Sequence, residues 1–278
     1  MHRFIMGRES LNRVTWGFAV LMFTLGLGIT SAHAQETKAA TSATDEKAMA
    51  TLMRMAEFLA KAPRFSVTID IGYDVEQDWG QKLEFGATRK ITVRRPDRLA
   101  VDITDRDGTR RGFRFDGKQI AFFGVDEKAY ATAQKSGDLD AAIAYFKQDL
   151  RMPLPLAELV SNNLPKILKD RTNEVYAVEE ATIGGILCDH LALRNDMVDG
   201  QMWIAKGNQP LPQRIVLTYK REDGQPQFWA NFREWNLSPE TPDSLFTFTP
   251  ADGMRRIAFV AGMGPDAGMK EQEQGAQP

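Results

Sequence analysis

The sequence predicts an α+β protein: a strongly curved antiparallel sheet of about 11 strands, forming an incompletely closed barrel, with helices capping or filling its concave side. Three observations support this fold class. Apolar and polar residues alternate over most of the chain, one helical stretch precedes the strands and two interrupt them, and Asp-Gly pairs separate successive strands. A sheet of that size curls strongly, and its apolar side needs a cover that only the helices can provide.

The N-terminal residues 1–34 are predicted to be an export signal. Three arginines precede an apolar run over residues 14–29, and the Ala-x-Ala pattern ending at Ala34 predicts cleavage after that residue. An uncleaved membrane anchor is the alternative, but about 16 apolar residues are fewer than the roughly 20 of a spanning helix. We therefore expect a periplasmic bacterial protein with one domain over residues 35–260 and a disordered tail over residues 261–278.

The composition excludes two classes of protein. Removing the signal takes away three Arg and one Glu, which leaves a net charge of −4. Nucleic-acid binding depends largely on Lys and Arg that neutralise phosphates, so we expect no nucleic-acid partner. Cys188 is the only cysteine, so a scaffold held by internal disulfides is excluded even in an oxidising compartment. Burial must hold the core together.

The segment from Asp45 to Ala62 is predicted to be an amphipathic helix, because apolar residues recur at helical spacing and Pro63 follows. Thr44 is its predicted N-cap. The predicted apolar face, which is rich in methionine, consists of Met49, Leu52, Met53, Ala56 and Leu59 or Ala60.

The apolar period then changes from about 3.6 to about 2 residues, which indicates strands that are buried on one face only. The first three strands are predicted at residues 64–75, 83–93 and 99–104. Two more carry Phe113 and Phe115 and cover residues 119–124, and a sixth strand is possible before the next helix. Asp107-Gly108 and Asp116-Gly117 provide turns, so these strands are expected to form an antiparallel meander.

Two helices interrupt the strands. Asp138 is the predicted N-cap of the first, and residues 153–164 are predicted to form the second, opened by Pro153 and Pro155. The first helix places Leu139, Ala142, Ile143 and Phe146 on one stripe. Strands return at residues 174–182, 186–195, 200–206, 213–220, 225–236 and 245–250.

A short series of motifs resembles a known superfamily. The pair Arg95-Pro96 ahead of a strand, then Phe115-Asp116-Gly117-Lys118 and an apolar aromatic strand at residues 120–123, is similar to the bacterial lipoprotein-carrier superfamily of LolA/LolB-like proteins. The order of helix, strands, helices and strands resembles that superfamily over nearly the whole mature chain. Residues 188–236 are closer to a family of predicted periplasmic proteins of unknown function assigned to it. The resemblance implies a curved sheet with a lipid-accommodating cavity. It does not imply an established activity.

Cys188 and His190 raise the question of catalysis or metal binding. They share one face of a predicted strand while Asp189 points to the other, so Asp189 is not placed to orient the histidine. A zinc site would lack two ligands, because His190 is the only histidine outside the predicted signal. The G-x-S-x-G, H-E-x-x-H and P-loop motifs are missing. We therefore interpret the pair as structural and predict no catalytic residue, metal site or cofactor.

The aromatic strands and the methionine-rich helix suit a cavity for irregular apolar ligands, because methionine repacks easily. We predict a non-enzymatic binding or carrier protein for a hydrophobic ligand, a lipid or an acyl group. A thiol-dependent hydrolase or transferase that uses Cys188 is the least favoured function. The residues predicted to contact the ligand are Val67, Ile69, Ile71, Leu83, Phe85, Leu99, Val101, Phe113 and Phe115.

A basic stretch provides the alternative function. It could be a set of solvated strand and turn faces, or a rim that meets anionic head groups or an acidic envelope protein. On the second interpretation the protein is an envelope interaction or chaperone-like module, with Arg110 and Arg111 as partner-binding residues. The stretch consists of Arg94, Arg95, Arg98, Arg106, Arg110, Arg111 and Arg114.

Overall fold

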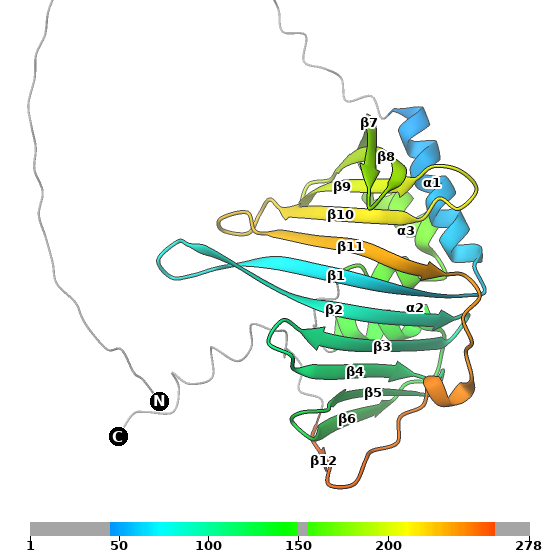
Figure 1. Ribbon diagram of the computed structural model, residues 1–278, viewed down its shortest axis with the longest axis vertical. Helices are drawn as coiled ribbons and strands as arrows, with labels where there is room; N and C mark the ends of the chain where they lie inside the picture. Colours follow the sequence, from blue (N-terminus) through cyan, green and yellow to red (C-terminus); the bar gives the residue numbers. More distant parts are fainter. Residues whose placement is uncertain (1–44, 150–154, 259–278) are drawn as a thin grey trace, which may run out of the picture. The chain divides into compact units, whose positions relative to one another are not determined.

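One sheet of twelve strands, with helices behind it, forms the part of the chain that the structure describes (Figure 1). The computed structural model describes residues 45–149 and 155–258. The described residues belong to a single compact unit, Ser42–Pro278. The predicted export signal, its cleavage after Ala34 and the predicted tail at 261–278 lie outside the described residues.

Helix α1 (Glu46–Lys61) confirms the predicted amphipathic helix. Its N-cap is Asp45, whose carboxylate accepts hydrogen bonds from the backbone N–H groups of Lys47 and Ala48 at 2.9 and 3.2 Å. Thr44, predicted for that role, lies outside the described residues. The buried face of α1 consists of Ala48, Leu52, Met55, Ala56 and Leu59.

Six strands follow α1 and form the predicted meander. Strands β1 and β2 are the longest and make a hairpin that projects beyond its neighbours in Figure 1. Glycines with positive φ sit in the predicted turns: Gly108, between β3 and β4, has φ 92°, and Gly117, between β4 and β5, has φ 82°. The strands are β1 (Arg64–Glu76), β2 (Lys82–Arg94), β3 (Arg98–Asp105), β4 (Arg110–Phe115), β5 (Gln119–Gly124) and β6 (Ala129–Gln134).

Four short helical segments come next: α2 (Leu139–Ala144), the π-helical turn η1 (Tyr145–Asp149), the 3₁₀ turn η2 (Ala157–Val160) and α3 (Leu164–Arg171). Asp138 caps α2 as predicted, since its carboxylate accepts a hydrogen bond from the N–H of Ala141 at 2.9 Å. Of the helix predicted over residues 153–164, residues 153 and 154 lie outside the described residues, and the prediction is wrong for the rest. Leu156 has a φ of 68°, which a right-handed helix cannot contain, and the α-helix begins at Leu164 with a proline in its first turn.

The second half returns to strands β7 (Glu174–Ile183), β8 (Ile186–Arg194), β9 (Val198–Ala205), β10 (Pro212–Tyr219) and β11 (Gln227–Asn236). The 3₁₀ turn η3 (Asp243–Leu245) and the short strand β12 (Arg255–Arg256) complete it. The strand predicted at residues 245–250 is wrong. Its alternating phenylalanines have another cause, because Phe246 is buried while the ring of Phe248 stacks on Phe123 with centroids 4.7 Å apart.

The strand order is β12-β6-β5-β4-β3-β2-β1-β11-β10-β9-β8-β7. Strand β1 pairs with both β2 and β11, which joins the two halves of the chain into one sheet. All described pairings are antiparallel except that of β12 with β6. The sheet is unclosed, with β12 and β7 at its ends. The predicted architecture is therefore confirmed, with β12 added to the expected strands.

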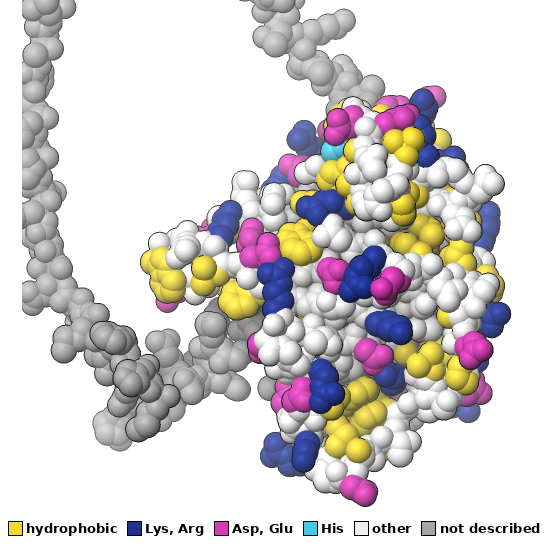
Figure 2. Space-filling model, viewed as in Figure 1, with side chains coloured by type: hydrophobic (Ala, Val, Ile, Leu, Met, Phe, Trp, Pro, Cys, Tyr) yellow, Lys and Arg dark blue, Asp and Glu magenta, His cyan; other side chains and the backbone are white. Residues whose placement is uncertain are grey.

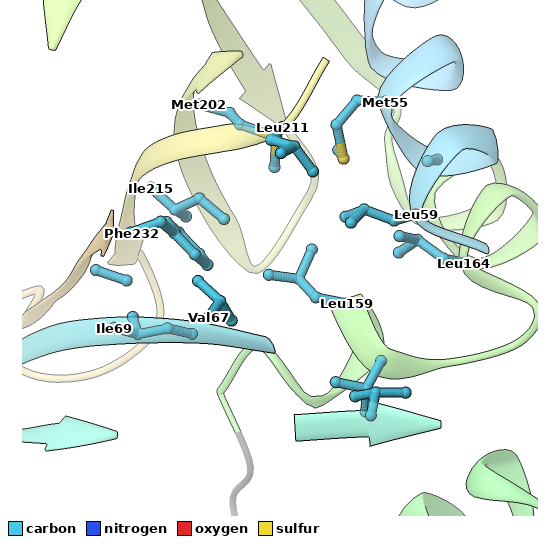
Figure 3. Packing of buried hydrophobic residues seen from close by; sticks show 14 of the residues in the cluster. Met55, Leu59, Val67, Ile69, Leu159, Leu164, Met202, Leu211, Ile215 and Phe232 are labelled. Carbon is cyan, nitrogen blue, oxygen red and sulfur yellow. The ribbon is translucent and has the colours of Figure 1, made fainter. Parts of the chain in front are cut away.

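The core lies between the helices and one face of this sheet, which we call the inner face. Val67, Ile69 and Ile71 of β1 point to it and are at most 3% exposed. Figure 3 shows side chains of α1, η2 and α3, among them Leu59, Leu159 and Leu164, facing the side chains of β1 and β9–β11. The opposite face, toward the viewer in Figures 1 and 2, is called the outer face.

Candidate functional site

An apolar cleft lies on the inner face, between η2 and α3 on one side and β8–β10 on the other. Its volume is about 210 Å³. Polar side chains at its edges include Glu158, Arg171 and Arg194. The apolar lining consists of Leu156, Leu159, Leu164, Ile167, Leu168, Leu193, Val198, Met202, Ile215 and Leu217.

The cleft is large enough for part of a hydrophobic molecule. An apolar protein cavity of about 150 Å³ already binds benzene, whereas pockets for whole small molecules are about 300–1,000 Å³. The cleft of about 210 Å³ falls between these sizes. It can hold the end of an acyl chain, and a longer ligand requires the helical segments to move.

Gly200 of β9 opens the cleft. A Cβ atom added there would lie 3.6 Å from Cβ of Leu193 and 3.7 Å from Cδ2 of Leu217, which are ordinary van der Waals distances. The backbone therefore tolerates a side chain at this position, and the space in front of it is part of the cleft. Glycine keeps that space empty.

Charged groups hold the helical segments around the cleft. The Glu158 carboxylate of η2 accepts hydrogen bonds from Nζ of Lys147 in η1 at 2.5 Å and from Nη1 of Arg171 in α3 at 2.8 Å. Its side chain is only 19% exposed. Burial raises the pKa of Glu158, but the bonds and charges of Lys147 and Arg171 outweigh burial and leave it below its ordinary value of 4.5.

Because the folded-state pKa of Glu158 is lowered, its stabilising effect is complete above pH 4.5 and is lost as the pH falls through the folded-state value. We expect Glu158→Gln to lower the melting temperature at about pH 7 and to lower it much less at about pH 3. Thermal unfolding of both proteins across this range measures the difference between their melting temperatures at each pH. The other carboxylates are the same in both proteins, so their titration does not contribute to this difference. A difference that stays constant down to the lowest pH would contradict the prediction.

Arg95 provides a second set of hydrogen bonds between the sheet and the helices. Its Nη1 donates to the carbonyl oxygen of Val160 and to Oδ1 of Asn162, each at 2.8 Å, and its Nη2 donates to the carbonyl oxygen of Leu59 at 3.1 Å. Burial lowers the pKa of Arg95 and the charge of Asp140 raises it. One guanidinium thus connects the end of β2 to α1 and η2.

The predicted ligand-contacting residues lie in three different environments. Val67, Ile69, Ile71 and Phe115 are buried in the packed core. Leu99, Val101 and Phe113 are on the inner face of β3 and β4 and are partly exposed. Leu83 and Phe85 lie on the projecting hairpin, where Phe85 is 46% exposed. None of the nine lines the cleft beneath α3.

The basic stretch is offset by nearby acidic groups. Arg110 pairs with Asp126 at 2.9 Å, and Arg111 pairs with Asp105. Four of the other arginines also have partners: Arg94 with Asp243, Arg98 with Asp97, Arg106 with Glu84 and Arg114 with Asp102. The stretch therefore presents alternating charges and less net positive charge than its sequence indicates. Figure 2 shows Lys or Arg side chains interspersed with Asp or Glu side chains over the outer face.

Cys188 and His190 share the face opposite Leu191, but they do not interact through a directed hydrogen bond in the structure. The Cys188 thiol is buried and donates to the carbonyl oxygen of Ile186 at 3.3 Å. Burial raises the pKa of this thiol, which disfavours the nucleophilic thiolate. His190 instead contacts Oε1 of Gln201 at 3.1 Å and stacks on Trp203 with ring centroids 4.1 Å apart.

The ring of His190 is the first of a row of stacked groups across the outer face. The Arg214 guanidinium lies 5.7 Å from the ring centre of Trp203 and 6.0 Å from that of Trp229. Trp229 is also contacted by Arg106 at 5.7 Å, and it covers Gly72, where a Cβ would lie 2.4 Å from its ring. Cation–π contacts of this kind stabilise an exposed sheet face, and His190 joins the row by stacking on Trp203.

Sequence reasoning missed Arg89, which lies on the inner face of β2. The apolar alternation of that strand, Leu83, Phe85, Ala87, Ile91 and Val93, is interrupted only at this residue. Arg89 pairs across the sheet with Ile69, a core residue. A charged residue at an inward position of an amphipathic strand was the signal that could have identified it.

Two further kinds of site are absent from the described residues. No group of three or more His, Cys, Asp or Glu side chains is placed to hold a metal ion within them. No described helix has the length and apolar character needed to cross a membrane. A hollow of about 330 Å³ beside β5, β6 and β12 has Gln119, Gln134 and Arg256 in its lining, which does not suit an apolar ligand.

Comparison with known proteins places the chain in one family and beside several solved structures. Residues 48–260 match DUF2092, a family described as predicted periplasmic protein. No curated protein matches the sequence. Among solved structures, an uncharacterized conserved protein from Thermus thermophilus shares 9% identity with a TM-score of 0.45, and the match covers 77% of this chain and 99% of that one.

Two other solved structures are similar at the same low level of identity. The lipoprotein LppX of Mycobacterium tuberculosis is 13% identical with a TM-score of 0.45, over 71% of this chain and 99% of that one. A LolA superfamily protein from Nitrosomonas europaea is 12% identical with a TM-score of 0.36, over 72% of this chain and 97% of that one.

Proposed function

The chain belongs to the DUF2092 family of predicted periplasmic proteins, and we propose that it is an exported, non-enzymatic protein that binds or carries a hydrophobic ligand between its sheet and its helices. The observation that carries this proposal is the apolar cleft of about 210 Å³ between α3 and β8–β10. A lipid or acyl group is the proposed ligand.

Burial alone can bind such a ligand. Each buried methylene group contributes about 0.8 kcal/mol, so the four to six carbons that the cleft could hold would contribute roughly 3–5 kcal/mol before ordering costs. Tighter binding needs more apolar surface. That surface exists on the inner face under the helical segments, which are fastened by the hydrogen bonds of Glu158 and Arg95. We propose that movement of these segments admits the rest of the ligand.

The first experiment identifies the ligand. The mature protein is purified from its own periplasm without detergent and analysed by native mass spectrometry before and after organic extraction. A stoichiometric apolar adduct that extraction removes is the expected result. A ligand-free mass, together with no binding of the neutral apolar dye N-phenylnaphthylamine, would contradict the proposal and favour an envelope-protein partner. The exposed Trp79 at the tip of the β1–β2 hairpin would then be the first residue to mutate.

Filling the cleft tests its location. We expect Gly200→Leu to place its side chain in the cleft and to weaken dye binding by about tenfold, the loss that corresponds to roughly 1.4 kcal/mol of apolar contact. Gly200→Ala, whose Cβ fits at ordinary contact distances, should bind nearly as the original protein does. Fluorescence titration measures both affinities.

A matched control adds a leucine elsewhere. Thr182→Leu changes an exposed residue of β7, outside the cleft, and should leave dye binding unchanged. Circular dichroism of all variants shows whether they remain folded. Unchanged dye binding in a folded Gly200→Leu protein would show that the ligand does not use the cleft.

A further inference from the structure

Arg89 points into the apolar side of the sheet. It pairs with Ile69 of β1 on one side and with Ile103 of β3 on the other, and Ile103 in turn pairs with Arg111 of β4. Side chains that face each other across neighbouring strands lie on the same face of the sheet. Arg89 and Arg111 therefore extend from the inner face, one strand apart, with an isoleucine between them.

The guanidinium of Arg89 has no hydrogen bond and no ion pair with any described residue, and its Nε atom is buried. Nε of Arg111 is likewise buried without a partner, although its Nη2 pairs with Asp105. Two cationic groups thus lie on this part of the inner face, and the Asp105 carboxylate pairs with only one of them. The two arginines have one more positive charge than the single carboxylate beside them, and some of their N–H groups have no acceptor. They can therefore bind a second anion.

An unpaired cation in this position is costly, because burial in an apolar environment removes hydration from the charged form. Burial lowers the pKa of the Arg89 guanidinium, and the charge of Arg111 lowers it further. Tyr73 and Asp105 act in the opposite direction without forming a hydrogen bond to it. A residue that destabilises the empty protein in this way is typical of a site built for a ligand.

The neighbouring inner face is apolar and partly exposed. The row next to the two arginines along the strands consists of Ile91, Val101 and Phe113, which pair across β2, β3 and β4. These three side chains are less completely buried than Val67, the residue of β1 in the same row. Unpaired positive charge therefore adjoins accessible apolar surface, which is the arrangement that an amphiphile with an acidic head fits.

We propose that Arg89, assisted by Arg111, binds the anionic head group of an amphiphilic ligand whose hydrocarbon chain lies along the inner face of β2–β4. The head group is a carboxylate or a phosphate, both of which accept the forked N–H donors of arginine. The inference rests on the proposed function and makes it more specific, because it names acidic amphiphiles as the ligand class. Arg89 is a binding residue in this proposal, and no chemical step is involved.

The test compares two ligands with the same chain. Laurate carries a carboxylate and dodecanol carries a neutral hydroxyl group, so titration calorimetry with each separates the contribution of the head group from that of the chain. In Arg89→Met, which keeps a side chain of similar reach without charge, we expect the affinity for laurate to fall about tenfold or more at pH about 7. The affinity for dodecanol should not change.

Arg110→Met is the matched control. Arg110 is on strand β4, next to Arg111 but on the outer face, and its charge is paired with Asp126. Its replacement should leave the affinities for both ligands as they are. If Arg89→Met does not fold, Arg89→Gln, which keeps polarity and removes charge, replaces it and should show the same loss for laurate.

The outcomes separate the inference from the proposed function. If neither laurate nor dodecanol binds, and the dye does not bind either, the proposed function fails and the inference fails with it. If both ligands bind and the folded Arg89 variants bind laurate as the original protein does, only the inference is wrong. Inorganic phosphate is tested alone by calorimetry. If phosphate binds in a way that depends on Arg89 and laurate does not bind, the site takes a free anion. The proposal of an amphiphilic ligand would then be wrong.

Stability of the ligand-free protein provides a second measurement. Because Arg89 carries an unpaired, partly buried charge, we expect Arg89→Met to raise the melting temperature of the extracted protein. Laurate should raise the melting temperature of the original protein more than that of the variant. A strong fall in the melting temperature of the ligand-free variant would instead show that Arg89 holds the fold together, and would contradict the proposal.

Discussion

Arg95→Met is expected to lower the free energy of unfolding by about 3–5 kcal/mol and to loosen the helices from the sheet. The change removes three donated hydrogen bonds, to the carbonyl oxygens of Val160 and Leu59 and to Oδ1 of Asn162. Hydrogen bonds from a charged group contribute about 1.5–3 kcal/mol each, and buried acceptors left without a donor add a further cost. The methionine retains most of the apolar contact of the side chain.

Chemical denaturation of the two proteins measures the loss in stability. Because the freed helices cover the inner face, dye binding in the absence of denaturant should rise in Arg95→Met. Arg110→Met removes an arginine of the exposed surface, whose ion pair is screened by water, and should leave stability nearly unchanged. A loss of stability as small as in that control would show that the helices are held by apolar packing alone.

Phe115→Ala is expected to have an effect of the same size, about 3–5 kcal/mol, because it removes a large side chain from a packed core. Phe115 is fully buried at the end of β4, where it pairs with Leu99 and Ile120 across the neighbouring strands. It was predicted to contact a ligand. In the structure it belongs to the buried core cluster, so its removal should act on folding.

Phe85→Ala is the control for Phe115→Ala, because it makes the same substitution at a partly exposed position. Phe85 is 46% exposed on the projecting hairpin and stacks on Tyr73 with ring centroids 6.2 Å apart. Its replacement should cost about 1 kcal/mol or less, since nearly half of the residue is already in contact with water in the folded protein. Equal losses for Phe85→Ala and Phe115→Ala would contradict the assignment of Phe115 to the packed core.

The alternation of residues along the strands predicted most of the sheet. Phe65, Val67, Ile69 and Ile71 of β1 point inward and are buried in the structure, because a strand that packs on one side must alternate. The helical period predicted α1, and the Asp-Gly pairs predicted turns that need positive φ at Gly108 and Gly117. These features depend on neighbours within a few residues, so the local sequence contains them.

Segments whose conformation depends on distant contacts were not predicted. Residues 245–250 look like a strand, but Phe248 packs on Phe123 of β5 without joining a ladder. The helix expected over residues 153–164 begins at Leu164 instead, after Leu156 takes a left-handed conformation. In both cases the apolar residues are those that pack against other elements. Their spacing therefore reflects these contacts and not a regular strand or helix.

The candidate site shows the same division. The sequence by itself determined that the strands bury one face, that helices must cover it, and that Cys188 and His190 share one face of a strand with Asp189 on the other. Only the tertiary structure decided that the cleft lies beneath α3, that Arg95 fastens the helices, and that Arg89 has no partner among the described residues. Alternation along a strand specifies the face of the sheet on which a side chain lies. Its hydrogen-bond partners and the cavities beside it depend on which distant strands and helices pack against that face.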